Sequence, residues 1–294
     1  AADGPARLAP ALGHFAPGRR SGRRQVARRD LLALAKPRIV LKLLWRAYEH
    51  VAMVVGLLLL ATVCLTWTPF ALLLNPLLPE ARAKRVGRGA IRGAFRLYLR
   101  LLSLLCACRF DLRELQALGR RGEPLVVVAN HPSLLDAVIL VACLPNAVCV
   151  MKARLMHNVL LGAGARMARY IVNDAPLPMI RGAIAELRQG ACLIIFPEGT
   201  RTVTPPVDAC ASTAGVIAAR AGVPVQALLI EMSTPYLGKH WPLWRPPVLP
   251  LSCRVRVGQR WAVLERPQQF GAEIEAYFRE AIDPAANQLP DARE

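Results

Sequence analysis

Two short strings in the middle of the chain carry side chains that could do chemistry. The first, Asn130-His131-Pro132-Ser133-Leu134-Leu135-Asp136, follows the apolar run 125–129. Pro132 favours an extended residue before it and a helix after it, so we expect His131 at a strand-to-helix turn and Asp136 about one helical turn later. A carboxylate within reach of an imidazole fixes its tautomer and stabilises its charged form, which suits a general base. A histidine with a purely structural role fits the same spacing.

Ser133 is the local candidate for a nucleophile. It lacks the Gly-x-Ser-x-Gly elbow of hydrolases, and serines at helix starts commonly act as caps. A base without an enzyme nucleophile would instead activate a hydroxyl group of the substrate. Both chemistries, a serine nucleophile and a substrate hydroxyl, stay open at this point.

The second string is Phe196-Pro197-Glu198-Gly199-Thr200-Arg201, at the end of the apolar run 192–196. A proline and a glycine two residues apart form a tight turn with exposed backbone N–H groups, to which Thr200 adds a hydroxyl and Arg201 a bidentate fork. Such a turn can hold a phosphate. The same residues also suit a plain surface turn with a solvated arginine.

Taken together, Asn-His-x-x-x-x-Asp and Phe-Pro-Glu-Gly-Thr-Arg about sixty residues later resemble the glycerolipid acyltransferase superfamily, over roughly residues 120–260. Type members of that family acylate lysophosphatidic acid. The resemblance implies that His131 is the general base, that Asp136 is its partner, and that the reaction needs no metal. It also implies that the acceptor is bound by Asn130, Lys152, Glu198, Gly199, Thr200 and Arg201.

The chain departs from the family pattern on the acceptor side. Asp174 stands where the family usually has an arginine, and Cys210-Ala211-Ser212-Thr213 replaces a Phe-Lys-x-Gly string. An acidic side chain repels phosphate, and the loss of one charge-assisted hydrogen bond weakens binding by roughly ten- to a hundredfold. The sequence therefore predicts an acceptor other than simple lysophosphatidic acid, with a headgroup that offers Asp174 a hydrogen-bond donor or a positive charge.

Short β-like runs alternate with helical stretches from residue 119 onward. This alternation predicts an α/β fold in which helices cover a mixed central sheet and site residues gather where strands end. The predicted strands are 125–129, 147–151, 170–173, 192–196, 223–230 and 253–257, and the predicted helices are 134–143, 154–168, 177–189, 208–221 and 270–281.

The part of the chain before the sheet divides into three segments by composition. Residues 1–30 are predicted to be a flexible basic tail, residues 31–80 a membrane anchor or re-entrant helix pair, and residues 81–118 a basic amphipathic helix that leads into the acyltransferase domain, 119–285. Val51 to Leu74 is free of formal charge over 24 positions, and ~20 apolar residues suffice for one crossing.

Three interpretations of this apolar segment stay open. It could cross the membrane once, it could be broken at its prolines into a re-entrant helix pair, or it could be the buried core helix of a soluble protein. The basic stripe that follows suits lipid headgroups, or it is a solvated helix face. That stripe consists of Arg85, Arg88, Arg92, Arg96 and Arg100.

Composition agrees with membrane contact. Hydrophobic residues make up 54% of the 294, and 38 Lys and Arg against 20 Asp and Glu leave a formal charge of +18. This composition excludes a disordered or coiled-coil protein. The arginines precede a lipid-like segment and do not interleave with aromatic residues, so we expect no nucleic-acid partner. None of the eight cysteines forms a Cys-x-x-Cys pair, which predicts reduced, buried thiols and no metal site.

We therefore predict a membrane-bound acyltransferase on the cytoplasmic face of the membrane, by expectation the bacterial inner membrane. It would move a fatty acyl group from acyl-CoA or acyl carrier protein, as co-substrate, to the hydroxyl of a lysophospholipid or related lysolipid, without a cofactor. An anionic membrane surface is the other expected partner, and the sequence predicts no oligomeric state. The alternatives are a lipid esterase that uses Ser133 and a non-catalytic basic protein that binds membranes.

One further segment, residues 235–250, is rich in proline and contains Trp241, Trp244, Lys239 and Arg245. Clustered tryptophan and basic residues suit a membrane interface or a lid over an acyl chain. An ordinary proline-rich loop is the plainer interpretation.

Overall fold

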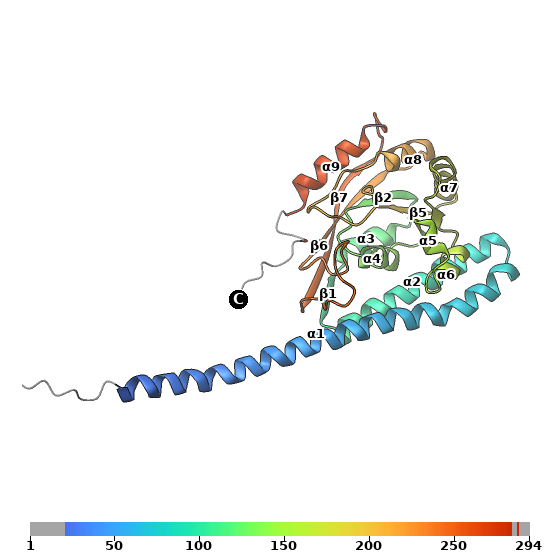
Figure 1. The fold of residues 1–294 in the computed structure, drawn as a ribbon. Coiled ribbons are helices and arrows are strands. Elements are labelled where there is room, and N and C mark those ends of the chain that lie inside the picture. Colours follow the sequence, from blue (N-terminus) through green and yellow to red (C-terminus); the bar gives the residue numbers. More distant parts are fainter. Residues whose placement is uncertain (1–20, 284–286, 288–294) are drawn as a thin grey trace, which may run out of the picture. The chain divides into compact units, whose positions relative to one another are not determined.

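The computed structural model describes residues 21–283 and Asn287, with side chains from Val40 onward (Figure 1). Contacts divide the chain into two units, residues 1–47 and 48–294, and the site lies in the second. Residues 1–20 of the predicted flexible tail, 1–30, lie outside the described residues. The other ten residues of this tail are helical, because helix α1 begins at Ser21, so the prediction of a flexible tail is wrong for them. Residues 23–36 contain no proline or glycine and are rich in the helix formers arginine, alanine and leucine.

Helix α1, Ser21–Leu77, is continuous through Pro69, so the predicted helix pair within 31–80 is wrong. The chain reverses only after Leu77, where Pro79 caps the returning helix α2, Glu80–Leu105. Small residues of α1 explain why it stays against the domain: Ala52 and Ala71 are buried, and Gly56 approaches Leu102 of α2. Residues Val40–Leu77 are long and apolar enough to cross a membrane.

Helix α2 corrects the predicted basic segment, 81–118. The helix ends at Leu105, and strand β1, Cys108–Asp111, and helix α3, Arg113–Arg121, already belong to the folded domain. The predicted basic stripe does not face solvent as a whole. Arg88 is buried, and Arg92 donates to the Cys143 carbonyl. The other three members of the stripe are exposed, namely Arg85, Arg96 and Arg100. The apolar face of this helix packs inward, through Ile91, Tyr98 and Leu102.

A seven-stranded mixed sheet forms the centre of the domain, in the order β1-β7-β6-β2-β5-β3-β4. Strands β6, β2, β5, β3 and β4 are parallel, and β7 and β1 run the other way. The mixed α/β prediction is confirmed, although β1 escaped it because four residues between helices give little pattern. The other strands are β2 (Leu125–Ala129), β3 (Ala147–Met151), β4 (Ile171–Val172), β5 (Cys192–Ile195), β6 (Val225–Met232) and β7 (Leu251–Trp261).

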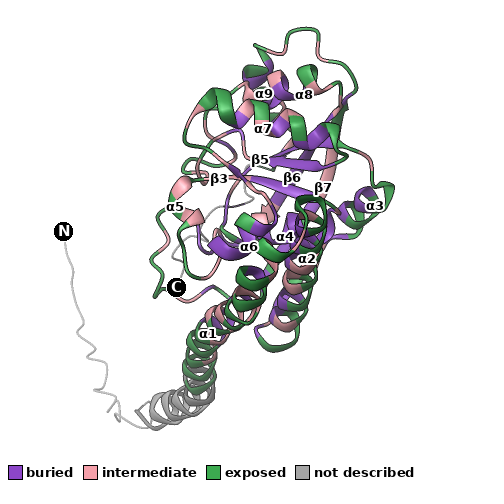
Figure 2. Cartoon of the chain, turned by 90° about the vertical axis from the view of Figure 1, so that its right-hand side faces the viewer, coloured by how far each residue is buried: buried purple, intermediate pink, exposed green. Residues whose placement is uncertain are grey.

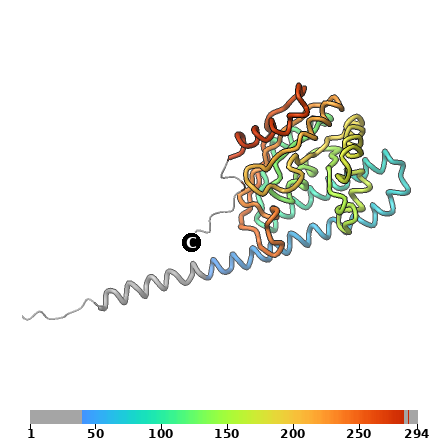
Figure 3. The backbone as a smooth tube through the Cα atoms, turned by 45° about the horizontal axis from the view of Figure 1, so that its top comes forward, coloured from blue at the N-terminus to red at the C-terminus, as the bar shows by residue number. Residues whose placement is uncertain are grey.

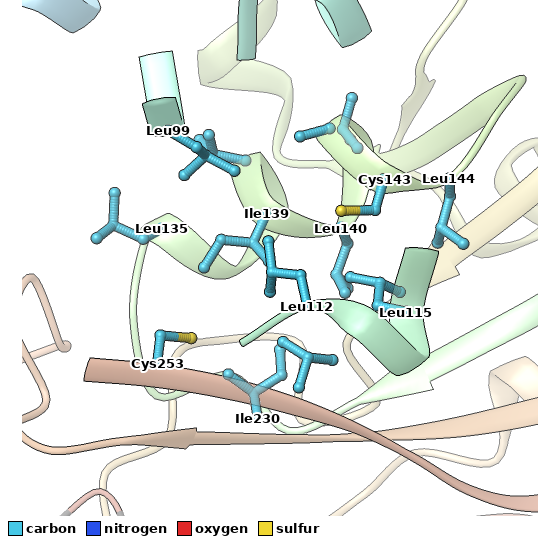
Figure 4. Close-up of a cluster of buried hydrophobic side chains, with 14 of the residues drawn as sticks. Leu99, Leu112, Leu115, Leu135, Ile139, Leu140, Cys143, Leu144, Ile230 and Cys253 are labelled. Carbon is cyan, nitrogen blue, oxygen red and sulfur yellow. The ribbon is translucent and has the colours of Figure 1, made fainter. Parts of the chain in front are cut away.

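Helices cover both faces of this sheet, and each face has its own apolar core (Figures 1 and 2). Helices α1 to α4 pack on one face, and Figure 4 shows Leu135, Ile139 and Leu140 of α4 between Leu99 of α2 and Ile230 of β6. The other face carries α7, α8 and α9. The remaining helix bounds are α4 (Leu135–Cys143), α5 (Ala153–Met156), α6 (Gly162–Met167), α7 (Pro176–Arg188), α8 (Thr213–Ala221) and α9 (Phe270–Ala281).

Seven of the eight cysteines are buried, Cys210 is partly exposed, and all eight are free thiols. The five parallel strands bring their carboxyl ends to one edge of the sheet. The loops after β2, β5, β3, β4 and β6 therefore meet there, which is where side chains of an α/β site gather. Both strings singled out in the sequence lie at this edge, directly after β2 and β5.

Candidate active site

The turn between β2 and α4 joins His131 to Asp136. The Nδ1 atom of His131 lies 2.9 Å from Oδ2 of Asp136, and the backbone N–H of Ser133 donates to the same oxygen over 2.7 Å. Asp136 is fully buried in the first turn of α4, whose inward face belongs to the core in Figure 4. The rigid start of α4 therefore holds the carboxylate against the imidazole.

The imidazole of His131 is held from a second side by Phe196, the residue that follows β5. The two rings stack with centroids 3.8 Å apart at 15°. Asp136 is the only described residue that hydrogen-bonds the ring, so the carboxylate fixes the proton on Nδ1 and leaves Nε2 to a substrate. The side chain is 14% exposed, enough for a substrate to reach it.

The electrostatics of Asp136 combine burial with donors. Burial raises the pKa of this carboxyl above its usual value, and the hydrogen bonds from His131 and from the Ser133 N–H oppose that rise. Arg201 contributes in the same direction as the donors, so its guanidinium lies within electrostatic range of the pair. The pair and the Glu-Gly-Thr-Arg turn thus form one site.

Ser133 does not have the geometry of a nucleophile. Its side chain is fully buried, its hydroxyl donates to the Tyr236 carbonyl over 2.6 Å, and it accepts from the N–H of Leu135. Its hydroxyl thereby holds the first N–H of α4 and ties the turn between β2 and α4 to the loop after β6. The esterase alternative loses its nucleophile.

Asn130 was expected to contact substrate, and the structure corrects this. The side chain is fully buried, donates to the Ile230 carbonyl and accepts from the Ile230 N–H, at 2.9 and 2.8 Å. The amide thereby continues the pairing of β2 with β6 beyond the last backbone pair. It positions His131, the next residue, and does not reach a substrate.

Glu198 is likewise committed to the protein itself. One oxygen accepts from the His131 N–H and the Thr202 hydroxyl, each over 2.9 Å, and the other accepts from the Asp208 N–H over 3.0 Å. Burial raises the pKa of Glu198, against these donors. The carboxylate holds the turn after β5 onto the catalytic turn, a role that the sequence did not indicate. Thr202, one residue beyond the motif, is part of the same clasp.

Gly199, Thr200 and Arg201, the other residues of the turn after β5, are exposed or half-buried. Gly199 has φ +65, a conformation that favours glycine, and its N–H closes the turn on the Phe196 carbonyl. Thr200 is half-buried. The Nη1 atom of Arg201 donates to the carbonyls of Leu237 and Gly238, each over 2.8 Å, and among described residues no other group binds the guanidinium.

The loop after β3 carries further cations. Lys152, singled out from the sequence, is exposed at the start of α5. Arg154, two residues later, was missed. Burial and the like charge of Arg154 lower the pKa of Arg201, so the two guanidinium groups lie in electrostatic range. The sequence signal that could have identified Arg154 is its position three residues after the end of β3, at the edge of the sheet where site residues gather.

Asp174 follows β4, at the edge of the sheet and separated from β5 by β3. It is exposed, and its Oδ1 accepts the N–H of its neighbour Ala175. The carboxylate is thus bound to the backbone just before α7. Of the sequence-predicted residues, His131, Asp136, Glu198 and Arg201 come together, whereas Lys152 and Asp174 lie on neighbouring loops.

Comparisons with known proteins agree with this geometry. Residues 110–231 match the family model "Acyltransferase". A 1-acyl-sn-glycerol-3-phosphate acyltransferase of Pseudomonas aeruginosa is 24% identical over 194 residues, which is 63% of this chain and 70% of that protein. The crystal structure of the 1-acyl-sn-glycerophosphate acyltransferase PlsC from Thermotoga maritima superposes with a TM-score of 0.53 at 19% identity, and covers 78% of this chain and 97% of that one.

The matched range begins in β1 and ends in β6, so it contains both strings and four of the five parallel strands in full. Within it the His131–Asp136 pair and the turn after β5 stand in hydrogen-bonded contact. The matched acyltransferase model, the curated relative and the PlsC fold together support placing the chain in the glycerolipid acyltransferase superfamily and support an acyltransferase enzyme.

Proposed function

We propose that this chain transfers a fatty acyl group from an acyl thioester to the hydroxyl of a lysophospholipid at a membrane surface. The observation that carries the proposal is the imidazole of His131, which Asp136 fixes through Nδ1 while Nε2 stays available at the end of β2. Acyl-CoA or acyl carrier protein would supply the thioester. Since acyl thioesters of this kind are cytosolic, the site would face the cytoplasm.

The mechanism follows from that geometry. Nε2 of His131 takes the proton of the acceptor hydroxyl as its oxygen attacks the thioester carbonyl, and Asp136 stabilises the imidazolium. When the tetrahedral intermediate collapses, the imidazolium returns the proton to the leaving thiolate. The enzyme forms no acyl intermediate, in keeping with the buried and bonded hydroxyl of Ser133.

A phosphate on the acceptor would be bound by Arg201 together with Arg154. Arg201 keeps donors free beside the catalytic pair, and Arg154 is close enough to lower its pKa. Two neighbouring guanidinium groups favour a dianionic group between them, because it removes their mutual repulsion. Arg154 would supply the second cation whose absence led us to expect a headgroup other than a simple phosphate.

Attachment to the membrane would use the outward face of α1. Val51, Leu58, Leu65 and Leu72 recur every seven residues on this face and are 47–61% exposed. The opposite face is occupied by the domain, for example where Asn75 accepts from Arg169 and Trp67 approaches Gly164. An apolar segment whose residues 48–77 pack against a folded domain lies on the bilayer more readily than it crosses it, so we propose a monotopic contact.

His131→Ala tests the proposed function. Acyl transfer to a lysophospholipid should fall by roughly 10²- to 10⁴-fold, because a general base typically contributes that much. The membrane-bound fraction should stay unchanged, and a cooperative thermal transition should show that the variant is folded, although the loss of the Asp136 partner lowers its unfolding temperature. His157→Ala, an exposed histidine after α5, serves as control and should keep full activity. Turnover retained in folded His131→Ala protein would refute the mechanism.

A further inference from the structure

The loop between β6 and β7, residues 233–250, presents apolar side chains to solvent at its tip. Trp244 is 77% exposed, Leu243 51% and Val248 43%. A soluble surface rarely gathers such residues in one loop unless they contact a partner. The loop leaves the sheet from the carboxyl end of β6, directly beside the catalytic turn that follows β2.

The base of this loop is fastened to the catalytic turn. The Tyr236 carbonyl accepts from Ser133, and the Leu237 carbonyl accepts from both Arg201 and the Leu134 N–H. A Cβ on Gly238 would lie 3.2 Å from the Pro132 carbonyl oxygen, so the backbone segments are in close contact. The position of the loop is therefore coupled, through these hydrogen bonds, to the turn that carries His131.

The far end of the loop is fastened to α1. The Leu249 N–H donates to Oε1 of Glu49 over 3.1 Å, and Figures 1 and 3 show this end of the loop beside α1. Glu49 immediately precedes the stretch of α1 that carries the exposed apolar stripe. The loop thus links the apolar helix to the catalytic turn within one folded unit.

The tip is ordered by its own contacts. The Trp241 indole donates to the Arg245 carbonyl over 2.8 Å, and the Arg245 guanidinium lies 4.5 Å above the same ring. The Trp241 ring also meets Tyr236 edge-on, with centroids 5.8 Å apart. Trp244, three residues beyond Trp241, is therefore exposed in a loop whose conformation these contacts fix.

Charge identifies the partner. Residues 233–250 contain Lys239 and Arg245 and no acidic residue, so the surface around the apolar tip is positive. Tryptophan and leucine flanked by cations suit the headgroup level of an anionic bilayer, where the indole is half-buried and the cations contact phosphate. A protein partner would require matching acidic groups and offers no such reason for an exposed indole.

We propose that residues 239–248 are a second lipid contact, which inserts Leu243 and Trp244 at the headgroup level of an anionic bilayer and holds the His131 turn at its surface. The proposal rests on the proposed function, because only an acceptor embedded in the membrane needs the site at that level. The loop, and not α1 alone, then sets the distance between base and acceptor.

The first test measures the depth of Trp244. The full chain and Trp244→Phe are reconstituted in vesicles of phosphatidylcholine and phosphatidylglycerol, and the difference between their emission spectra isolates Trp244. We expect this emission to be quenched by lipids brominated on the acyl chains and protected from aqueous iodide. As a control, Val263→Trp in the Trp244→Phe background adds an indole at a site 82% exposed, after the opposite end of β7. Its emission should be quenched by iodide alone, and the same behaviour from Trp244 would overturn the proposal.

The second test separates lipid contact from chemistry. The double variant Leu243→Ser, Trp244→Ser should lose roughly tenfold in activity on a long-chain lysophospholipid in vesicles, because the transfer of two apolar side chains into the interface is lost. Activity on a water-soluble short-chain acceptor should be unchanged. Equal losses on both acceptors, or no loss on either, would overturn the proposal. A chain that acylates no lysophospholipid at all would refute the proposed function, while the quenching measurement would still decide on the loop.

Discussion

At the scale of single residues, the site separates side chains that face the substrate from side chains that hold loops together. His131 and Arg201 keep hydrogen-bonding atoms available to a substrate, whereas Asn130, Ser133 and Glu198 are bound to backbone groups of neighbouring segments. The second group explains how a turn with few regular hydrogen bonds keeps an imidazole in one orientation. Most polar side chains of the two strings therefore hold the protein together, and only a few keep atoms free for a substrate.

The prediction at this scale concerns the acceptor's phosphate. Arg154→Ala should raise the KM for lysophosphatidic acid by roughly ten- to a hundredfold and leave kcat nearly unchanged, since a charge-assisted contact contributes about 1.5–3 kcal/mol and takes no part in proton transfer. Steady-state kinetics with one acyl thioester measure both constants. Arg120→Ala, exposed on α3, is the matched control.

A companion variant, Asp174→Arg, distinguishes the two hypotheses on the headgroup. If Arg154 completes the phosphate site, Asp174→Arg should leave the acceptor preference as it is, because the exposed carboxylate binds only the N–H of its neighbour Ala175. A strong gain for lysophosphatidic acid in Asp174→Arg, together with an unaffected Arg154→Ala, would instead favour a headgroup recognised by Asp174.

At the scale of elements, a buried ion network locks α2 to the far end of the sheet. Arg88 donates to Glu186 of α7 over 2.6 Å, to Asn146 and to the Ala168 carbonyl, and Lys84 bridges the second Glu186 oxygen over 2.7 Å. An arginine that sequence periodicity assigned to a lipid-facing stripe thus fixes the helix to the domain. Breaking one member would leave buried charges unpaired.

Glu186→Gln should therefore lower the free energy of unfolding by about 3 kcal/mol at neutral pH, as expected for a buried pair that loses one partner. Burial alone would raise the pKa of Glu186, but the bonds from Lys84 and Arg88 outweigh it and lower the pKa below its ordinary 4.5. A carboxylate with a depressed pKa contributes stability that is complete above the unfolded-state pKa and is lost as pH falls through the folded-state pKa.

The difference between Glu186→Gln and the unmodified protein should consequently shrink from pH 6 to pH 3, measured by urea unfolding. Glu280→Gln, an exposed carboxylate on α9, should show no such difference at any pH. A deficit in Glu186→Gln that persists undiminished at pH 3 would contradict an ionised Glu186 in the folded state.

At the scale of the whole molecule, the apolar content of the chain serves two purposes. One part fills the two cores of the sheet, and the other lies on the outward face of α1, where Figure 2 shows mostly exposed residues. The same helix buries Ala52, Cys64 and Ala71 against the domain. A single helix thus carries a structural face and an exposed apolar face.

The double variant Leu58→Glu, Leu65→Glu should shift the folded protein from the membrane fraction to the soluble fraction, because two side chains worth ~1.5–3 kcal/mol each lose their apolar environment. Ala52→Glu, on the packed face, should instead lower the thermal unfolding temperature, since it buries a charge. Ultracentrifugation and a thermal scan of both proteins measure these effects. Folded Leu58→Glu, Leu65→Glu protein that stays in the membrane fraction would exclude this face as the lipid contact.

By itself, the sequence determined the class of the fold and placed His131 and Asp136 as a pair. Alternation of apolar runs with helical stretches placed β2, β3 and β5 to within a residue, because buried parallel strands are short continuous apolar runs. The spacing of His131 and Asp136 across a strand-to-helix turn is a local property, so it too could be derived from neighbouring residues. The apolar segment of α1 was equally visible, since it needs only length and hydropathy.

Tertiary structure alone decided what depends on residues far apart in the sequence. Asn130 and Ile230 are 100 positions apart in the sequence, and Arg88 and Glu186 are 98 positions apart. A linear pattern does not show which polar groups at such separations bind each other in the interior. Buried donors and acceptors require partners, and the partner is chosen by the packing of strands and helices. For that reason the partners of Asn130 and Glu198, expected to bind substrate, and of Ser133, the candidate nucleophile, were found only in the folded chain. The same holds for the electrostatic effect of Arg154 on Arg201.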